Sequence, residues 1–241
     1  MTPGGEKKLS EEETRRLGSP EKVPRPRIQA LSDLIFGLAL SIGAISILSE
    51  KPASVTDLAV SLLGFGWAFL ILAMVWVRYT RIMSALPVET GGVMAVNMLL
   101  LFLVSIEPYL YNLVGGSITS SNSVAQLSSE TTTALYALDM GSIFLILAFF
   151  TNELSRGVRK LIPKDLLESY RLQTISTVVS AVLFLVSCFP FFWDVTIFGF
   201  HSRFFMWMGT FLVWIVRRGL ESRLFRKNEP RSRVNVPVKQ S

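Results

Sequence analysis

Charged and hydroxyl side chains stand at the start of the chain's first long apolar stretch. Arg27, Ser32 and Asp33 open a run that continues to about residue 48 and can span a bilayer. A charge at the edge of the hydrocarbon costs up to about 3 kcal/mol on insertion scales, so we expect Asp33 to face protein or water. Because six residues of helix turn through about 600°, Arg27 and Asp33 lie about 120° apart and are poorly placed to pair. Their partners are therefore expected on neighbouring helices, with Arg78 or Arg81 as donors to Asp33.

An apolar stripe follows in the same run. Leu38, Ile42 and Ile45 recur at spacings of four and three, and Ser41 stands beside them, so these residues share one helical face. A narrow ring of such side chains could gate an ion path by dewetting, because water and a hydrated ion are both disfavoured there. The alternative is that the stripe only packs this helix against its neighbours.

The composition places the chain in a membrane. Half of its 241 residues are hydrophobic, 17% are charged and the mean hydropathy is +0.45, which is far from an ordinary soluble domain. Six apolar runs are long enough to span: 28–49, 57–79, 92–114, 132–153, 172–191 and 199–219. Each run is continuous rather than alternating, which favours helices over barrel strands. The sequence predicts an all-α integral membrane protein with six transmembrane helices per subunit.

The basic residues predict the orientation. With the N-terminus inside, the cytoplasmic segments hold most of the arginines and lysines, whereas the external side holds only Lys51 and Arg203. Both termini are therefore expected in the cytoplasm. The net charge of +6 is then explained by topology and by contact with anionic membrane lipids rather than by nucleic acid.

Few residues suggest other chemistry. The single histidine, His201, and the single cysteine, Cys188, leave no multi-histidine metal site and no disulfide within one chain. We expect no enzyme, no cofactor and no metal. Glu107 and Asp139 fall inside the third and fourth spans, where acids are functional candidates. They could line a cation-attracting vestibule or bond a neighbouring helix.

Three stretches carry a resemblance. They are the Arg-x-x-x-(aromatic or aliphatic)-Ser-Asp pattern at 27–33, Val75-Trp76-Val77 with Arg81, and the run 97–102 followed by Pro108. Together they resemble the transmembrane protein 175 family of potassium-permeable channels. The resemblance covers about residues 27–114, and the later half agrees only in hydropathy.

That resemblance implies roles for individual residues. In the family, the first helix of each subunit lines the central pathway, so Leu38, Ile42 and Ile45 would form its narrowest point and Ser41 a hydroxyl layer. We expect the motif residues to form a structural polar network, with ion ligands as the alternative: Arg27, Ser32, Asp33, Arg78 and Arg81. The chain departs from the family at Leu31, Tyr79 and Thr80, where the family has Phe and His residues, so we expect this network to be rebuilt.

The sequence supports three functions. The first, implied by the resemblance, is a potassium-permeable cation channel of the cell membrane, with four identical subunits around a pore lined by the first helix. The alternative is a proton-coupled secondary transporter that uses Glu107 or Asp139, although no inverted repeat is visible. The third is a non-conducting scaffold. We expect residues 1–25 to be a disordered tail, 26–221 the channel domain and 222–241 a basic cytoplasmic tail.

Overall fold

The computed structural model describes residues 27–49, 54–84, 91–119, 129–157, 164–198 and 200–228. The expected N-terminal tail at 1–25 lies outside these residues. The last helix continues to Asn228, so the predicted boundary between residues 221 and 222 falls inside a helix rather than at its end.

The described residues are helical almost throughout. The elements are α2 (Arg27–Ser49), α3 (Val55–Met83), α4 (Gly91–Thr119), α5 (Ser129–Gly157), α6 (Lys164–Val186), α7 (Phe191–Asp194), β1 (Thr196–Ile197), β2 (Phe200–His201) and α8 (Ser202–Asn228). Six of them correspond to the six predicted apolar runs. The predicted all-α fold is therefore confirmed.

Four of these helices are long and apolar enough to cross a membrane: α3, α4, α5 and, within α6, residues Glu168–Val186. In α2 the apolar segment Gln29–Ile45 is shorter. The chain is thus an all-α membrane protein. The count of six spans and the cytoplasmic position of both termini stay predictions.

The segment between α6 and α8 differs from the prediction. The fifth span was expected to reach residue 191, but α6 ends at Val186 and a turn follows. Pro190 lacks the backbone N–H that would continue the helix. The chain instead forms α7 and a small antiparallel hairpin of β1 and β2, and Ser202 N donates to Val195 O over 2.8 Å where α8 begins.

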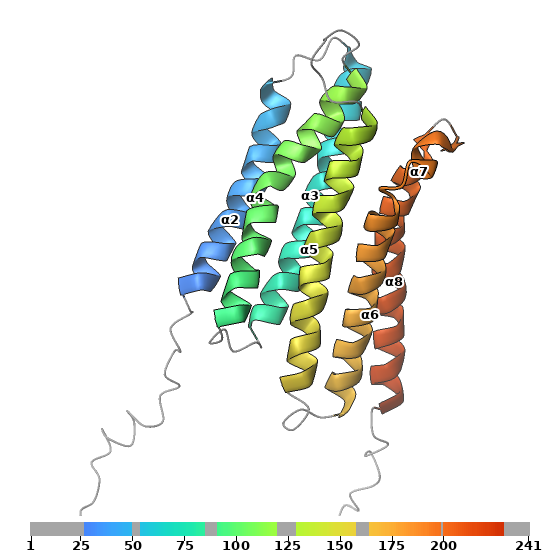
Figure 1. Ribbon diagram of the computed structural model, residues 1–241. Helices are drawn as coiled ribbons and strands as arrows, with labels where there is room; N and C mark the ends of the chain where they lie inside the picture. The colour runs from blue at the N-terminus through green and yellow to red at the C-terminus, as the bar shows by residue number, and fades with distance from the viewer. Residues whose placement is uncertain are drawn as a thin grey trace, which may run out of the picture.

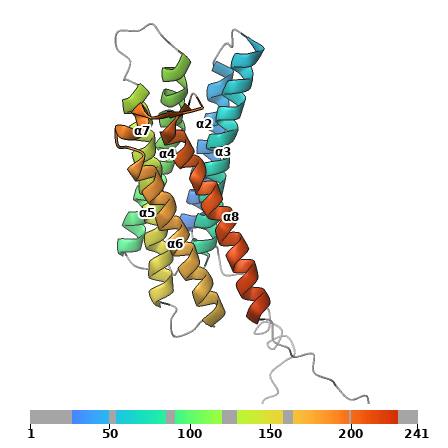
Figure 2. The same cartoon turned by 90° about the vertical axis from the view of Figure 1, so that its right-hand side faces the viewer.

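The long helices form one bundle, in which α2 lies at one edge beside α3 and α4 (Figure 1). Helix α5 packs against α4 and α6, and α8 packs against α6 at the opposite edge (Figures 1 and 2). Aromatic side chains fill the core between α5, α6 and α8: the Trp207 ring centroid lies 5.0 Å from that of Tyr136 and 5.8 Å from that of Phe184. One face of α2 is not covered by the other described helices of its own subunit.

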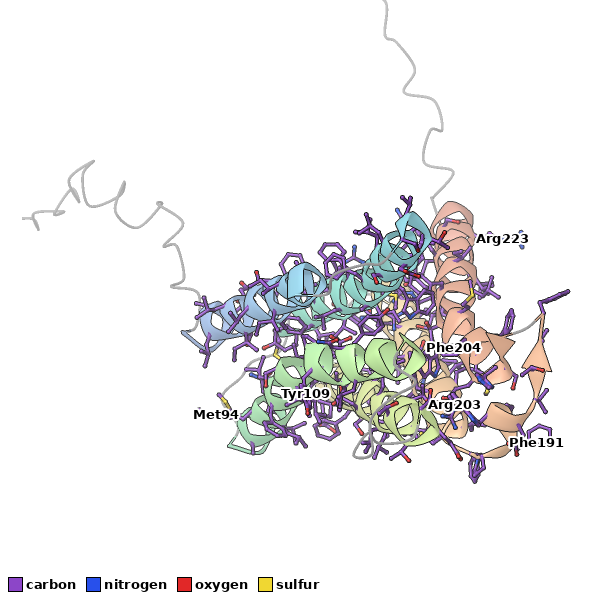
Figure 3. All side chains as sticks on the ribbon, turned by 90° about the horizontal axis from the view of Figure 1, so that it is seen from above. Met94, Tyr109, Phe191, Arg203, Phe204 and Arg223 are labelled. Carbon is purple, nitrogen blue, oxygen red and sulfur yellow. The ribbon has the colours of Figure 1, made fainter. Side chains whose placement is uncertain are left out.

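Arg203, which the sequence placed among the external charges, is buried at the start of α8 (Figure 3). Its Nη1 donates to the Glu130 carbonyl oxygen over 3.1 Å and to Thr133 Oγ1. Its guanidinium also lies 5.3 Å from the centre of the Trp193 ring. These contacts are those of a structural cation that ties α8 to the beginning of α5.

Helices α5 and α6 approach each other closely at Gly141. A Cβ atom at this position would lie 2.7 Å from both Cγ and Cδ2 of Leu185 and 3.5 Å from the Ala181 carbonyl oxygen. Small residues at such positions let the backbones of membrane helices approach. Gly141 therefore sets the distance between these two helices.

Gly141→Ala is expected to destabilise the protein, because the new methyl group must displace Leu185. The matched control is Gly66→Ala in α3, where a Cβ atom would have nothing within 4 Å. The control should be neutral or stabilising by up to about 1 kcal/mol through helix propensity. Thermal unfolding of the purified protein measures both. Equal stability of the two variants would show that the close approach of α5 and α6 does not restrict the size of the side chain at position 141.

Candidate functional site

One face of α2 carries the predicted stripe and is uncovered. Leu38 is 58% exposed, Ile42 43% and Ile45 61%. Ser41 is also exposed, and its Oγ donates to the Gly37 carbonyl oxygen over 2.8 Å. The three apolar residues and the hydroxyl thus share a surface that no described helix of the same subunit covers.

The opposite face of α2 is packed. Phe36 and Ala39 are buried in the core, and the Phe36 ring centroid lies 5.4 Å from that of Tyr79 on α3. Both faces of the helix are apolar, so burial within the subunit accounts for only one of them. The uncovered face must meet lipid, an ion pathway or another subunit.

A buried chain of hydrogen bonds joins α2 to α3 and α4. Tyr79 Oη lies 2.6 Å from Ser32 Oγ and donates to Asn97 Oδ1 over 2.9 Å. Since the Tyr79 proton is used on Asn97, the Ser32 hydroxyl donates to Tyr79. All three side chains are inaccessible to solvent, so the network fixes the rotation of α2 about its own axis.

Asp33 has a different partner from the one expected. Trp76 Nε1 donates to Asp33 Oδ1 over 3.1 Å, and Asp33 is half-buried. Arg78 points away from α2, and its Nη1 donates to Thr177 Oγ1 on α6 over 3.5 Å. Arg81 is exposed near the end of α3. Within the described part of the chain, neither Arg78 nor Arg81 bonds Asp33, so the predicted hydrogen bond was wrong.

The predicted network residues thus separate into two groups. Ser32 and Asp33 contact the face of α3 that meets α2. Arg78 instead contacts α6, and the charge of Arg81 acts on Arg217 of α8. Arg27 is the first residue of α2, and its side chain lies outside the part described.

Three residues that the sequence did not assign to the network are central to it: Trp76, Tyr79 and Asn97. Signals for all three were present. Tyr79 stands where the family has a histidine, and Trp76 and Asn97 belong to the stretches that carry the resemblance. A polar residue within an apolar helix needs a partner, which could have marked Asn97.

The two intramembrane acids are also buried together. Glu107 on α4 and Asp139 on α5 are close enough to interact electrostatically, and Tyr136 Oη donates to Glu107 Oε1 over 3.4 Å. Neither carboxyl oxygen of Asp139 has a hydrogen-bond partner among the described residues. The pair lies within the bundle, on the side of α4 and α5 rather than on the exposed face of α2.

Comparison with known proteins gives a match to one family. Residues 27–108 match the family model described as the endosomal/lysosomal potassium channel TMEM175. No curated protein matches the chain. The matched region begins at Arg27 and ends at Pro108, the limits of the three motif stretches.

Two solved structures are similar to the chain. One is a lysosomal potassium-selective channel TMEM175 homologue from Chamaesiphon minutus, at 18% identity and a TM-score of 0.49, covering 85% of this chain and 97% of that one. The other is a variant of the potassium channel MtTMEM175 in complex with a nanobody fusion protein, at 15% identity and a TM-score of 0.50, covering 86% of this chain and 94% of that one. The resemblance of α2, α3 and α4 to the TMEM175 family, predicted from their motifs, is thus confirmed over residues 27–108.

Proposed function

We propose that the chain is one subunit of a potassium-permeable channel of the cell membrane, in which α2 lines the pore. The family matched by residues 27–108 is described as a potassium channel, and so is MtTMEM175, which supports this class of function. Neither description concerns an enzyme.

The observation that carries the proposal is the uncovered apolar face of α2. Leu38, Ile42 and Ile45 project from it, while the buried bonds of Ser32 and Tyr79 hold the other side of the helix in place. A helix anchored on one side presents its free face in a fixed orientation. Copies of that face around an axis would form an apolar constriction that closes by dewetting, next to a layer of Ser41 hydroxyls.

A single α2 cannot enclose a path, so the pore needs several subunits. Identical chains most often assemble with closed rotational symmetry, which would bring the same face of each α2 to one axis. We propose a homotetramer, following the resemblance. Potassium ions and membrane lipids are its other expected partners.

The proposed channel predicts unitary current steps in planar bilayers containing the purified protein. In a potassium/sodium gradient the reversal potential should shift toward the potassium equilibrium value. Native mass measurement of the same preparation should give four copies of the chain. Flux without unitary steps, from a protein that stays monomeric, would contradict the channel.

A second candidate, the proton-coupled secondary transporter, is favoured by the buried acids. Asp139 has no hydrogen-bond partner among the described residues, and a buried carboxyl group of this kind can take up and release a proton. A transporter would give potassium flux driven by a pH gradient and abolished by Asp139→Asn, without unitary steps. A channel lined by α2 would keep its current steps in that variant.

A further inference from the structure

Four arginines interact electrostatically between the last turns of α3, which hold Arg78 and Arg81, and the second half of α8, which holds Arg217 and Arg218. Arg78 is 3% exposed and Arg217 7% exposed, whereas Arg81 and Arg218 are exposed. The positive charge of Arg217 acts on Arg78, and the charges of Arg81 and Arg218 act on Arg217. We call these four residues the arginine cluster. The sequence predicts that this end of the bundle faces the cytoplasm.

The two buried arginines of the cluster, Arg78 and Arg217, use few of their N–H donors in hydrogen bonds. Arg78 makes one long hydrogen bond to Thr177 and lies 5.6 Å from the centre of the Phe144 ring, while its Nε and Nη2 have no partner among the described residues. Arg217 Nε lies 3.8 Å from Glu221 Oε1, which is too long for a hydrogen bond, and its Nε and Nη1 are likewise unsatisfied. A guanidinium group has five N–H donors, so most of this capacity is unused.

Among the described residues, Glu221 is the acid that pairs with the cluster, so one carboxylate faces four arginines. Within the described ranges, the arginine cluster makes one ion pair, which joins Arg217 and Glu221. Glu221 also accepts a hydrogen bond from Ser169 over 3.1 Å. Burying like charges with unpaired donors is costly unless an anion is present. An anion that is not part of the chain, bound between the two buried guanidinium groups, would satisfy the donors that Arg78 and Arg217 leave unused.

We propose that the arginine cluster binds a phosphate group, supplied by the headgroup of an anionic phospholipid or as free phosphate. Arginine suits phosphate because its planar fork can donate two parallel hydrogen bonds. The exposed Arg81 and Arg218 add their positive charge to that of Arg217, which would attract an anion toward the buried pair.

The surroundings of the cluster also suit a lipid. Ile215, Val216 and Leu220 are exposed on α8 beside Arg217, so an acyl chain would have apolar surface to contact. Anionic lipids are enriched in the cytoplasmic leaflet, where the positive-inside rule places this end of the bundle. A bound phosphate would connect α3 to α8 through the two buried guanidinium groups and so stabilise the subunit.

The test compares thermal unfolding and lipid retention of the purified full chain. Micelles with phosphatidylglycerol should raise the unfolding midpoint, micelles with phosphatidylcholine should not, and native mass spectra should show retained phosphatidylglycerol. The third sample contains inorganic phosphate and no phosphatidylglycerol, and its unfolding midpoint is measured in the same way. Protection by phosphate equal to that by phosphatidylglycerol would identify the free anion as the ligand, and protection only by the lipid would identify the headgroup.

Variants distinguish a binding site from a structural one. Arg78→Gln and Arg217→Gln should each weaken lipid retention by about tenfold, because a charged donor is lost. Arg223→Gln, exposed on the same helix as Arg217, is the matched control and should retain the lipid as the wild type does (Figure 3).

Glu221→Gln should change lipid retention in the opposite direction to the arginine variants. It removes the carboxylate that competes for Arg217, so phosphatidylglycerol retention should rise, which a purely structural role of Glu221 would not produce. The proposal is overturned if neither phosphatidylglycerol nor phosphate protects the wild type. It is also overturned if folded Arg78→Gln and Arg217→Gln retain the lipid as strongly as Arg223→Gln.

Discussion

Ile42→Asn is expected to raise the resting potassium flux of reconstituted liposomes by about tenfold, which corresponds to lowering the barrier by about 1.4 kcal/mol. Ile42 stands on the uncovered face of α2 between Leu38 and Ile45. In the proposed pore an amide at this level would hydrogen-bond water and keep the constriction wet. Leu38→Asn should act in the same direction, because it lies one turn away on the same face.

The control for this prediction is Ile175→Asn on α6. Ile175 is also an exposed isoleucine, but it lies on a helix that the proposed pore does not use. Any general effect of an asparagine on a membrane-exposed surface should appear there too. If both α2 variants assemble normally and conduct like the wild type, the stripe is not the gate, and α2 packs against lipid or a neighbouring subunit instead.

The helices could be predicted from the sequence because a membrane demands long apolar runs. Each predicted run has a corresponding helix. The region after Val186 could not be predicted in the same way, since its aromatic residues continue the apolar run past the point where the helix ends. Its fold depends on Pro190 and on bonds such as that from Ser202 to Val195, which hydropathy does not report.

The exposed face of α2 was also predictable, because residues spaced by three and four share a side of any helix. The partners of the polar residues were not. Consecutive helical residues point about 100° apart, so Tyr79 faces α2 while the adjacent Arg78 faces α6. The sequence shows that a charged residue stands near a helix end, but it does not show which neighbouring helix the side chain contacts.

The burial of Arg203 could not be predicted for a related reason. The positive-inside rule counts charges at each side but does not separate an exposed arginine from one that bonds Thr133 and Glu130 inside the bundle. The structure shows that Arg203 and Arg217 are both buried, which a count of loop charges overlooks.

Tyr79→Phe is expected to destabilise the subunit by roughly 2 kcal/mol, because it removes from the buried network the hydroxyl that both Ser32 and Asn97 contact. Interhelical hydrogen bonds in membrane proteins average only about 0.6 kcal/mol, so a loss of this size requires that no water replaces the missing hydroxyl. Thermal unfolding measures the loss, and Tyr109→Phe, on the exposed side of α4, should leave stability unchanged.

A double-mutant cycle shows whether the network acts as one unit. Ser32→Ala alone removes the donor to Tyr79 but leaves the bond from Tyr79 to Asn97, so it should cost less than Tyr79→Phe. The double variant should then cost little more than Tyr79→Phe, since the same bond is lost in both. Additive losses would mean that Ser32 and Tyr79 contribute separately, and α2 would then be held mainly by the packing of Phe36 and Ala39.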